Sequence, residues 1–312
     1  MEKKYLEKDY IILEVPKQYQ YNSQIDFTNI NEKYYDVVKD FYQTLKRTIQ
    51  EDNLTNFYNR IPSLIINDKI SLMKVCNTLK ITNTTADYVS KSNQIYIYHN
   101  KKENPTDTLN HELLHMSSSF YDKSNNIDYC GFSQSYNMLE IGTALNEGYT
   151  EYKNYEIFNM NIEQIYYIYE FIITKLLEVI INKTTMEKLY FNADLYNLVK
   201  ELEKYNKLSN IKKFIFKTDF ILCLKENPFY KSKKCKYIMD INYFLLETYI
   251  NKLYHLYINK KITKLELEEL YMYFIEELKV LLDINLAINK DVLRKNIYDT
   301  VEIQLCKVRK LI

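Results

Sequence analysis

Glycine is scarce in this sequence: the chain has three glycines and four prolines among 312 residues. All-β proteins need many tight turns, and those turns depend on both residue types. The chain also carries 32 tyrosines, 14 phenylalanines and many isoleucines and leucines, so it has ample apolar surface to bury in a core. These features exclude an all-β protein and a disordered one, and they favour a helical fold.

Apolar residues from about residue 143 onward repeat at the spacing of amphipathic helices. In the amino-terminal part, the same spacing predicts a helix over Asn31–Gln50. The Asn227-Pro228 step and the basic run Lys231–Lys236 indicate a loop, whose lysines are more simply explained as solvated than as a polyanion site. Further helices are predicted over Ile162–Leu177, Leu195–Leu202, Ile211–Leu224, Tyr243–Leu256 and Leu265–Leu282, with a last one after Asp291.

Short strands are predicted in the amino-terminal half of the chain. Gln94–Tyr98 has the clearest signal because its residues are β-branched and aromatic, and weaker signals occur at Tyr10–Val15 and Ser63–Ile66. We therefore expect an α+β, mainly helical fold. It would have an amino-terminal lobe of residues 1–142 and a helical carboxyl-terminal lobe of residues 143–312.

The charge balance limits the classes of partner. With 42 basic and 41 acidic residues, the chain lacks the basic excess of a nucleic-acid-binding protein. Its most apolar segment, residues 164–181, is interrupted by Glu170, Lys175 and Glu178, so no membrane span is expected. The first residues do not resemble a secretory signal, and the five cysteines show no CxxC spacing. These observations predict a cytoplasmic protein; they leave its oligomeric state open.

A short window of the sequence holds all three glycines, Gly131, Gly142 and Gly148. Glycine is retained where the backbone needs a positive φ or where another group approaches closely. In a chain that otherwise avoids glycine, this clustering points to a functional site near residues 131–148.

Residues 111–115 of the same region read His-Glu-Leu-Leu-His. On a helix, His111 and His115 project from one face about one turn apart, which suits two corners of a tetrahedral zinc site. Glu112 would then lie beside a zinc-bound water. The surrounding sequence predicts such a helix, with Asn104 as N-cap and Pro105 in the first turn. Its buried stripe would contain Leu109, Leu113, Met116 and Phe120.

A catalytic zinc site needs a third protein ligand. An extended HExxHxxGxxH motif is excluded, because Ser118 and Tyr121 occupy the places of its glycine and last histidine. Three downstream glutamates, Glu140, Glu147 and Glu151, lie within reach of the histidines. The last two belong to the segment Asn-Glu-Gly-Tyr-Thr-Glu, whose helical pattern places them one turn apart on one face.

HExxH followed by a helical NExx(S/T)(D/E) segment resembles the gluzincins, the thermolysin-like zinc metallopeptidases in the broad sense. The resemblance covers about residues 86–158. It implies a zincin-like core with a small sheet, in which Gln94–Tyr98 is the edge strand that aligns an extended peptide. It also implies that Glu147 is the third zinc ligand and that Glu151 orients a ligating histidine.

The activity implied by the resemblance is hydrolysis of peptide or protein substrates, with one Zn²⁺ ion per chain and Glu112 as the general base. The sequence departs from the family pattern in three ways. The interval between His115 and Glu147 is longer and contains a hairpin or loop over residues 128–136. Glu151 stands where aspartate is more usual. No motif marks the residue that stabilises the oxyanion, for which His255 is the only histidine in the carboxyl-terminal half.

Two other functions remain open on the sequence alone. The chain could be an inactive zincin-fold protein that acts as a binding module, or a toxin-like protease with a single protein target. Metal content separates the first from an enzyme, and the range of cleaved peptides separates the second from a general peptidase.

Overall fold

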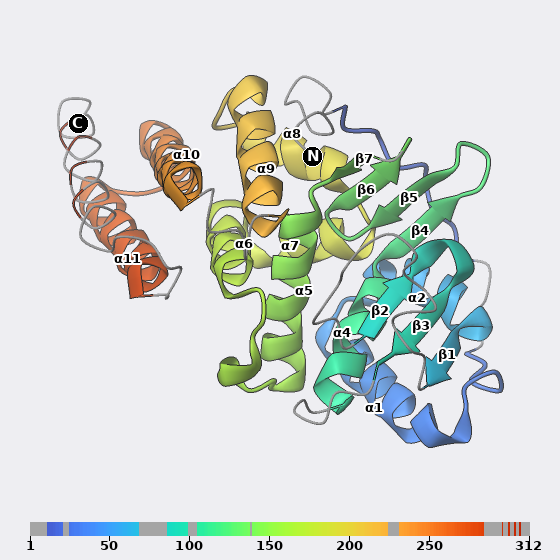
Figure 1. The fold of residues 1–312 in the computed structure, drawn as a ribbon. Helices are drawn as coiled ribbons and strands as arrows, with labels where there is room; N and C mark the ends of the chain where they lie inside the picture. Colours follow the sequence, from blue (N-terminus) through green and yellow to red (C-terminus); the bar gives the residue numbers. More distant parts are fainter. Residues whose placement is uncertain are drawn as a thin grey trace.

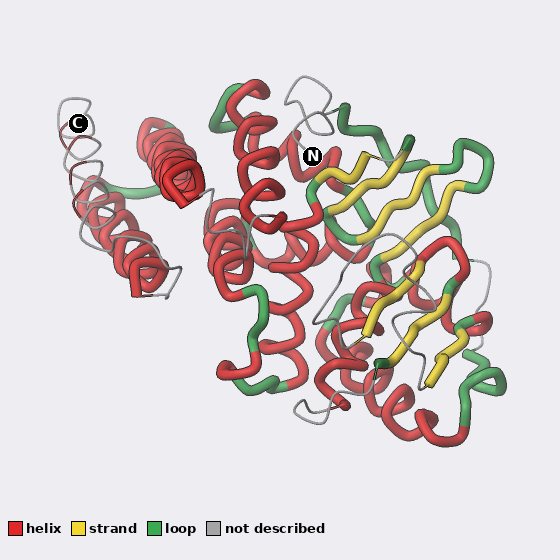
Figure 2. Tube along the Cα trace, viewed as in Figure 1, coloured by secondary structure: helices red, strands yellow, loops and turns green. Residues whose placement is uncertain are grey.

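The structure is a computed structural model that describes residues 11–20, 25–68, 86–98, 105–137, 139–223 and 231–283, together with Lys295, Asp299, Ile303 and Cys306. Helices dominate it, and two small sheets lie together on one side of the molecule (Figure 1, Figure 2). The predicted α+β, mainly helical class is confirmed. None of the described helices combines the length and apolar character needed to cross a membrane.

Residues 11–20 run as an extended segment without strand pairing. The strand predicted at Tyr10–Val15 is therefore wrong for residues 11–15, and Tyr10 lies outside the described residues. The reason is that Leu13 pairs with a side chain instead of a strand. The buried amide of Gln134 accepts from Leu13 N–H at 2.9 Å and donates to Leu13 C=O at 2.6 Å.

The helix predicted over Asn31–Gln50 is confirmed as α1 (Glu32–Thr48), capped by the side chain of Asn31. Its apolar stripe packs into the main core. A shorter helix, α2 (Thr55–Arg60), follows it. Four 3₁₀ turns join the larger elements of the described chain: η3 (Glu51–Asn53), η4 (Ile61–Ser63), η5 (Ser90–Ser92) and η6 (Ile162–Gln164).

The first sheet contains β1 (Ile65–Asp68), β2 (Ala86–Val89) and β3 (Gln94–Ile97) in the order β1-β3-β2. The strands predicted near Ser63–Ile66 and Gln94–Tyr98 are thus present. The prediction that Gln94–Tyr98 is the edge strand is wrong, because β3 pairs with β1 on one side and with β2 on the other. The edge strand beside the HExxH helix is β2.

The predicted HExxH helix is α4 (Pro105–Ser117), and it packs against β2 and α2. Leu109, Leu113 and Met116 are buried as expected. Phe120 is not part of this stripe, because the helix ends at Ser117 and Phe120 already belongs to the next strand. The predicted N-cap, Asn104, lies outside the described residues.

The second sheet is an antiparallel meander that follows α4 directly. The segment 128–136 forms its central hairpin, with Gly131 at the turn at a φ of 52°. The extended segment 11–20 is held against one face of this sheet by side-chain hydrogen bonds from Tyr129, Gln134 and Tyr136. The strands are β4 (Ser119–Asp122), β5 (Ile127–Cys130), β6 (Ser133–Tyr136) and β7 (Leu139–Ile141).

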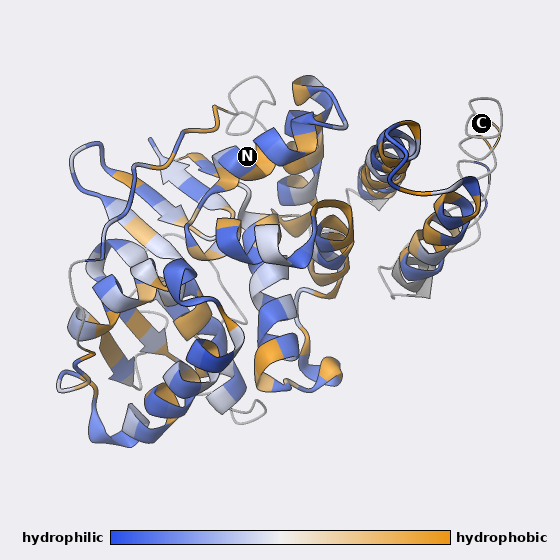
Figure 3. Ribbon diagram, turned by 180° about the vertical axis from the view of Figure 1, so that it is seen from behind, coloured by the Kyte–Doolittle hydropathy of each residue, from blue (hydrophilic) through white to orange (hydrophobic). Residues whose placement is uncertain are grey.

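Helix α5 (Thr143–Phe158) begins after Gly142 and lies against α4 and α6 (Ile168–Ile181) (Figure 1). The helix predicted from Ile162 starts later, at Ile168, because η6 and a short connection come first. Most residues of α6 are apolar and buried between neighbouring helices, and Figure 3 shows such hydrophobic helix faces towards the middle of the molecule.

Among the remaining helices, α10 and α11 lie on the side of the molecule away from the sheets, whereas α9 packs against α5 and β7 (Figure 1). A loop was predicted at the basic run Lys231–Lys236, but these residues form the first turns of α10; Asn227-Pro228 lies outside the described residues. The described residues after Asp291, namely Lys295, Asp299, Ile303 and Cys306, are helical. The helices are α7 (Lys183–Phe191), α8 (Leu195–Glu203), α9 (Leu208–Cys223), α10 (Lys231–Ile258) and α11 (Lys264–Asp283).

One hydrophobic cluster of buried residues extends from Ile30 on the amino-terminal side to Leu278 in α11. It includes residues from both predicted lobes. The boundary at residue 142 coincides with the junction between β7 and α5, and the division into lobes stays a prediction.

Candidate metal centre

Helices α4 and α5 bring three metal-ligating side chains together. His111 and His115 lie one turn apart on α4, and Glu147 lies on the facing side of α5. The Nε2 atoms of the two histidines are 3.0 Å apart. Glu147 places Oε2 at 3.3 Å from Nε2 of His111 and Oε1 at 3.5 Å from Nε2 of His115. Among the described residues, this is the group of His, Cys, Asp and Glu side chains that could hold a metal ion.

These three separations fit a tetrahedral zinc ion. Zinc binds histidine nitrogen and carboxylate oxygen at about 2.0–2.1 Å, so neighbouring ligand atoms lie about 3.3 Å apart. The separations of 3.0, 3.3 and 3.5 Å lie near that value, and the last two are made by different oxygens of Glu147. Three ligands leave one coordination position free, as in catalytic rather than structural zinc sites.

Glu151 lies behind His111, one helical turn after Glu147. Its Oε2 is 3.9 Å from Nδ1 of His111, and its Oε1 accepts a hydrogen bond from Tyr166 N–H at 3.2 Å. The side chain is buried, and burial raises the pKa of its carboxyl group above the ordinary value. A carboxylate at this place favours a proton on Nδ1 of His111 and leaves Nε2 free to bind a metal.

The outer nitrogen of His115 has three neighbours. Nδ1 lies 3.2 Å from Asn146 Nδ2, 3.4 Å from Thr150 Oγ1 and 3.7 Å from Cys130 Sγ. The Thr150 hydroxyl can accept a hydrogen bond from Nδ1–H, whereas the amide nitrogen of Asn146 can only donate to Nδ1, so the two neighbours favour opposite tautomers. Asn146 and Thr150 belong to the same motif as Glu147, so their helical spacing was a usable signal. Cys130 comes from the hairpin, and no sequence pattern links it to His115.

Mutual interactions perturb the pKa values of the three ligands. Burial alone would raise the pKa of Glu147, but His115 and His111 hold it well below its ordinary value. Burial alone would lower the pKa of His115, yet Glu147 and Cys130 raise it overall. Glu147 is therefore ionised in this arrangement, and its carboxylate is the anionic member of the three-residue cluster.

Glu112 is buried beside the two histidines, as its position in the motif predicts. Burial raises the pKa of its carboxyl group, while a backbone hydrogen bond from Tyr88 on β2 opposes the rise. Asp87 precedes Tyr88 on the same strand. Burial, Glu112 and Glu147 raise the pKa of Asp87 to about 7. The edge strand β2 thus borders the acidic side of the centre.

Tyr167 is a site residue that the sequence did not reveal. Its ring stacks on His111 with the centroids 6.2 Å apart and the planes at 27°. The nearby charge of Glu147 and then burial raise the pKa of its phenol well above the usual value. The residue immediately precedes α6, and among 32 tyrosines nothing in the sequence distinguishes it.

The structure leaves two other candidates outside the three-residue cluster. His255 lies on the exposed side of α10, where it contacts the ring of Tyr205 and the side chain of Asn259. It is not among the residues that surround His111 and His115, so the structure does not support it as the oxyanion-stabilising residue. Glu140 is exposed on β7, and it is not part of the three-residue cluster.

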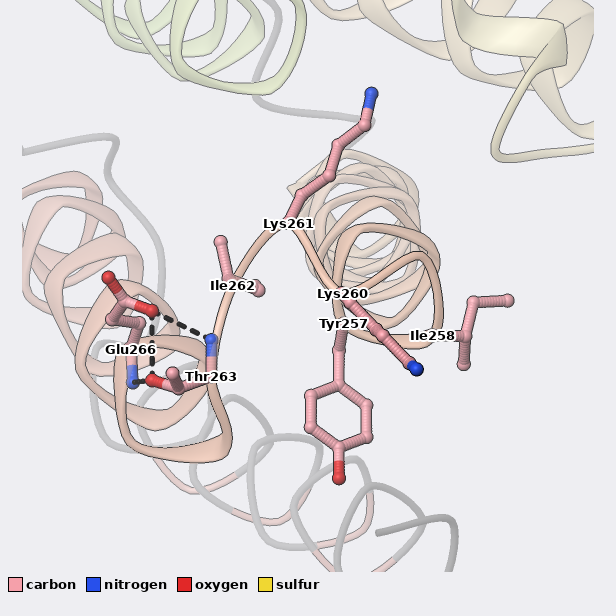
Figure 4. Close-up of a pocket in the computed structure, with 7 residues that line it drawn as sticks. All are labelled: Tyr257, Ile258, Lys260, Lys261, Ile262, Thr263 and Glu266. Carbon is pink, nitrogen blue, oxygen red and sulfur yellow. Dashed lines mark hydrogen bonds between the residues drawn. The ribbon is translucent and has the colours of Figure 1, made fainter.

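An open pocket also occurs at the turn between α10 and α11 (Figure 4). Its polar groups serve helix capping: Thr263 N–H and Oγ1 donate to Glu266 Oε2 at 2.7 and 2.8 Å, and Glu266 N–H donates to Thr263 Oγ1 at 3.2 Å. Lys260 and Lys261 also line it, and the carboxylate of Glu266 is engaged by the cap.

Comparisons with known proteins were made for the whole chain. No protein-family model matches it, and neither a curated protein nor a solved structure shows significant similarity to it. Interpretation of the site therefore depends on its own residues and geometry.

Proposed function

We propose that this chain is a zinc-dependent metallopeptidase of the gluzincin type, acting on peptide or protein substrates in the cytoplasm. The observation that carries the proposal is the convergence of both histidines of HExxH and of Glu147 within 3.0–3.5 Å of one another. The first sheet, α4 and α5 would be its zincin-like core. The free fourth coordination position is what distinguishes a catalytic site from a structural one.

His111, His115 and Glu147 would hold the ion. Bound zinc lowers the pKa of a coordinated water towards neutrality and polarises a carbonyl group. Glu151 behind His111 and Thr150 beside His115 would favour the tautomers that present Nε2 to the metal. The residues around His111 and His115 would thereby determine both the protonation and the orientation of the two imidazoles.

Glu112 is the general base of the proposed reaction. Its raised pKa makes it a stronger proton acceptor than an exposed glutamate, and the backbone N–H of Tyr88 holds its carboxylate in place. Glu112 takes the proton of the attacking water and passes it to the leaving amine nitrogen. Because the same backbone contact ties Glu112 to β2, a peptide paired with this edge strand would lie beside the base.

Tyr167 is the donor that we assign to the substrate carbonyl oxygen. The raised pKa of its phenol keeps the proton on the oxygen throughout the neutral range, so it can donate a hydrogen bond where negative charge develops. Its stacking on His111 fixes the ring beside the metal ligands. Tyr167 thereby replaces His255 as the proposed oxyanion-stabilising residue.

The test combines zinc analysis with peptide hydrolysis on the same preparations. Wild-type protein should hold about one zinc per chain, and Glu147→Gln should lose most of it because a neutral amide is a poor ligand. Glu140→Gln is the matched control on β7 and should keep its zinc. Glu112→Gln should keep zinc but lose turnover by ~10²–10⁴-fold, as expected for removal of a general base.

Each alternative function has its own result in this experiment. Zinc binding without hydrolysis of any peptide or lysate protein would indicate a binding module. Cleavage of a single lysate protein, with no cleavage in a peptide library, would indicate a protease with one target. Absence of any transition metal from protein purified without chelator would overturn the proposal.

A further inference from the structure

We propose that Asp219, on α9, is a positioning residue for the metal centre, which fixes the start of α5 and through it the place of Glu147. The inference rests on the proposed function in that it assumes a metal bound by Glu147. Asp219 is far from the motif in the sequence, and the hydrogen bonds that it accepts from α5 come from Gly142 and Ala144, which precede Glu147.

Both carboxylate oxygens of Asp219 bind the first turn of α5. Gly142 N–H donates to Oδ2 at 2.8 Å, and Ala144 N–H donates to Oδ1 at 3.0 Å. Asp219 is only 6% exposed, so these charge-assisted bonds are shielded from water. They satisfy backbone donors that the first turn of a helix otherwise leaves unpaired.

Helix α5 cannot supply such a cap from its own N-cap position. Gly142 occupies that position at a φ of 79°, and it has no side chain to accept a hydrogen bond. A Cβ atom there would lie 2.1 Å from the carbonyl oxygen of Phe132, so serine, threonine or aspartate could not replace it without moving the turn that precedes β6. The chain therefore obtains the cap from another helix.

The position of this cap matters because Glu147 lies in the second turn of α5. Its two oxygens must reach nitrogens on α4 at 3.3 and 3.5 Å. Fraying or rotation of the first turn would displace Glu147 and also Asn146, whose Oδ1 accepts from Phe132 N–H at 3.3 Å. The negative charge of Asp219 additionally favours the positive end of the helix dipole.

Zinc affinity of variants, measured by competition with a chromophoric chelator, tests this inference. Asp219→Asn keeps the shape of the side chain but removes its charge and one acceptor, and Asp219→Ala removes both acceptors. We expect zinc affinity to fall by about tenfold or more, within the range seen when groups behind metal ligands are lost. The absorption spectrum of the cobalt-substituted protein should also change, because the ligand geometry changes.

Asp194→Ala is the matched control. Asp194 caps α8 by accepting from Asn197 N–H at 2.9 Å, and α8 carries no residue of the metal centre. Its loss should lower the melting temperature and leave both zinc affinity and the cobalt spectrum unchanged. The comparison separates a positioning role from a general loss of stability.

Three results would count against the inference. Wild-type zinc affinity and an unaltered cobalt spectrum in Asp219→Asn would overturn it while leaving the proposed function intact. An equal loss of affinity in Asp194→Ala would also overturn it, since the effect would then be one of stability alone. A wild-type protein that binds no zinc would refute the proposed function and this inference together.

Discussion

Oε2 of Glu151 lies 3.9 Å from Nδ1 of His111, and no residue in the described part of the chain donates a hydrogen bond to it. A buried carboxylate oxygen without a donor carries a free-energy cost. A small movement of His111 towards Glu151 would form an N–H···O bond and remove that cost. A single hydrogen bond between the two side chains would therefore both fix the orientation of the His111 imidazole and give the Glu151 oxygen its missing donor.

The first prediction follows from this pair. Glu151→Gln should weaken zinc binding or turnover by ~10–100-fold, because the amide is a weaker acceptor for Nδ1–H of His111. The measurement is chelator competition together with a hydrolysis assay. Glu163→Gln in the exposed turn η6 is the control and should change neither quantity. Equal behaviour of the two variants would remove Glu151 from the centre.

The second prediction concerns Tyr167. Tyr167→Phe keeps the ring on His111 but removes the phenolic donor, so zinc content should stay unchanged. The turnover number should fall by ~10²–10³-fold, the usual effect of losing one donor to an oxyanion. Tyr166→Phe is the matched control, because the residue is 48% exposed, its link to Glu151 is made by the backbone, and the substitution keeps the ring that packs on Tyr167. A Tyr167→Phe protein with the wild-type turnover number would exclude the assigned role.

The third prediction concerns pH and the metal-free protein. The folded-state pKa of Asp87 is about 7, against 3.8 for an unperturbed aspartate. Between these values the folded chain binds a proton that the unfolded chain releases, so this group lowers stability progressively as pH rises. Asp87→Asn should therefore raise the melting temperature in the presence of chelator. The gain should grow from about pH 4 to about pH 7 and then remain constant.

Asp26 provides the contrasting case for this measurement. The backbone N–H of Thr28 lowers the pKa of Asp26, so its contribution to stability is present above the unfolded pKa and is lost in acid. Asp26→Asn should not stabilise the protein anywhere between pH 4 and pH 8. A gain from Asp87→Asn that is independent of pH would contradict the electrostatic explanation.

The fourth prediction concerns a buried charge network beside the centre. Lys153 on α5 is fully buried, and its Nζ lies 2.5 Å from Glu156, 3.0 Å from Glu178 and 3.0 Å from Glu187. Lys153→Met leaves these carboxylates without their shared cation and should lower the free energy of unfolding by about 3–5 kcal/mol. Denaturant titration measures this loss.

Lys183 is the control for this network. It also contacts Glu156 and Glu187, but its side chain is 54% exposed. Lys183→Met should cost about 0–1 kcal/mol, as for other exposed ion pairs. If the two substitutions had equal effects, burial would not be what makes Lys153 important.

Local patterns in the sequence predicted the parts of the site that depend on helix geometry. His111, Glu112 and His115 need only the repeat of one helix to share a face, and Glu147 and Glu151 need only that of the next. Likewise, the apolar spacing within Asn31–Gln50 was enough to predict α1. The motif gives no information about how the two helices contact each other, and this contact is seen only in the structure.

The features that sequence analysis missed depend on pairing between distant segments. The edge position belongs to β2 because β1, encoded earlier in the chain, pairs in parallel with the other side of β3. Asp219 and Tyr167 reach the region of the centre from α9 and from the residue before α6. The loop predicted at the basic run Lys231–Lys236 was wrong, because a run of charged residues is typical of a solvated connection but is equally compatible with a helix.

Gly148 lies where the backbone of Glu170, in the first turn of α6, crosses α5; a Cβ atom at this position would be 2.3 Å from the carbonyl group of Glu170. Even alanine would therefore force the two helices apart. Tyr167 enters α6 just before this crossing, so any such separation would carry its phenol away from His111. Gly148 thus acts as the spacer that sets the distance between Tyr167, the proposed hydrogen-bond donor, and His111, a proposed metal ligand, although Gly148 itself has no side chain that could bind metal or substrate.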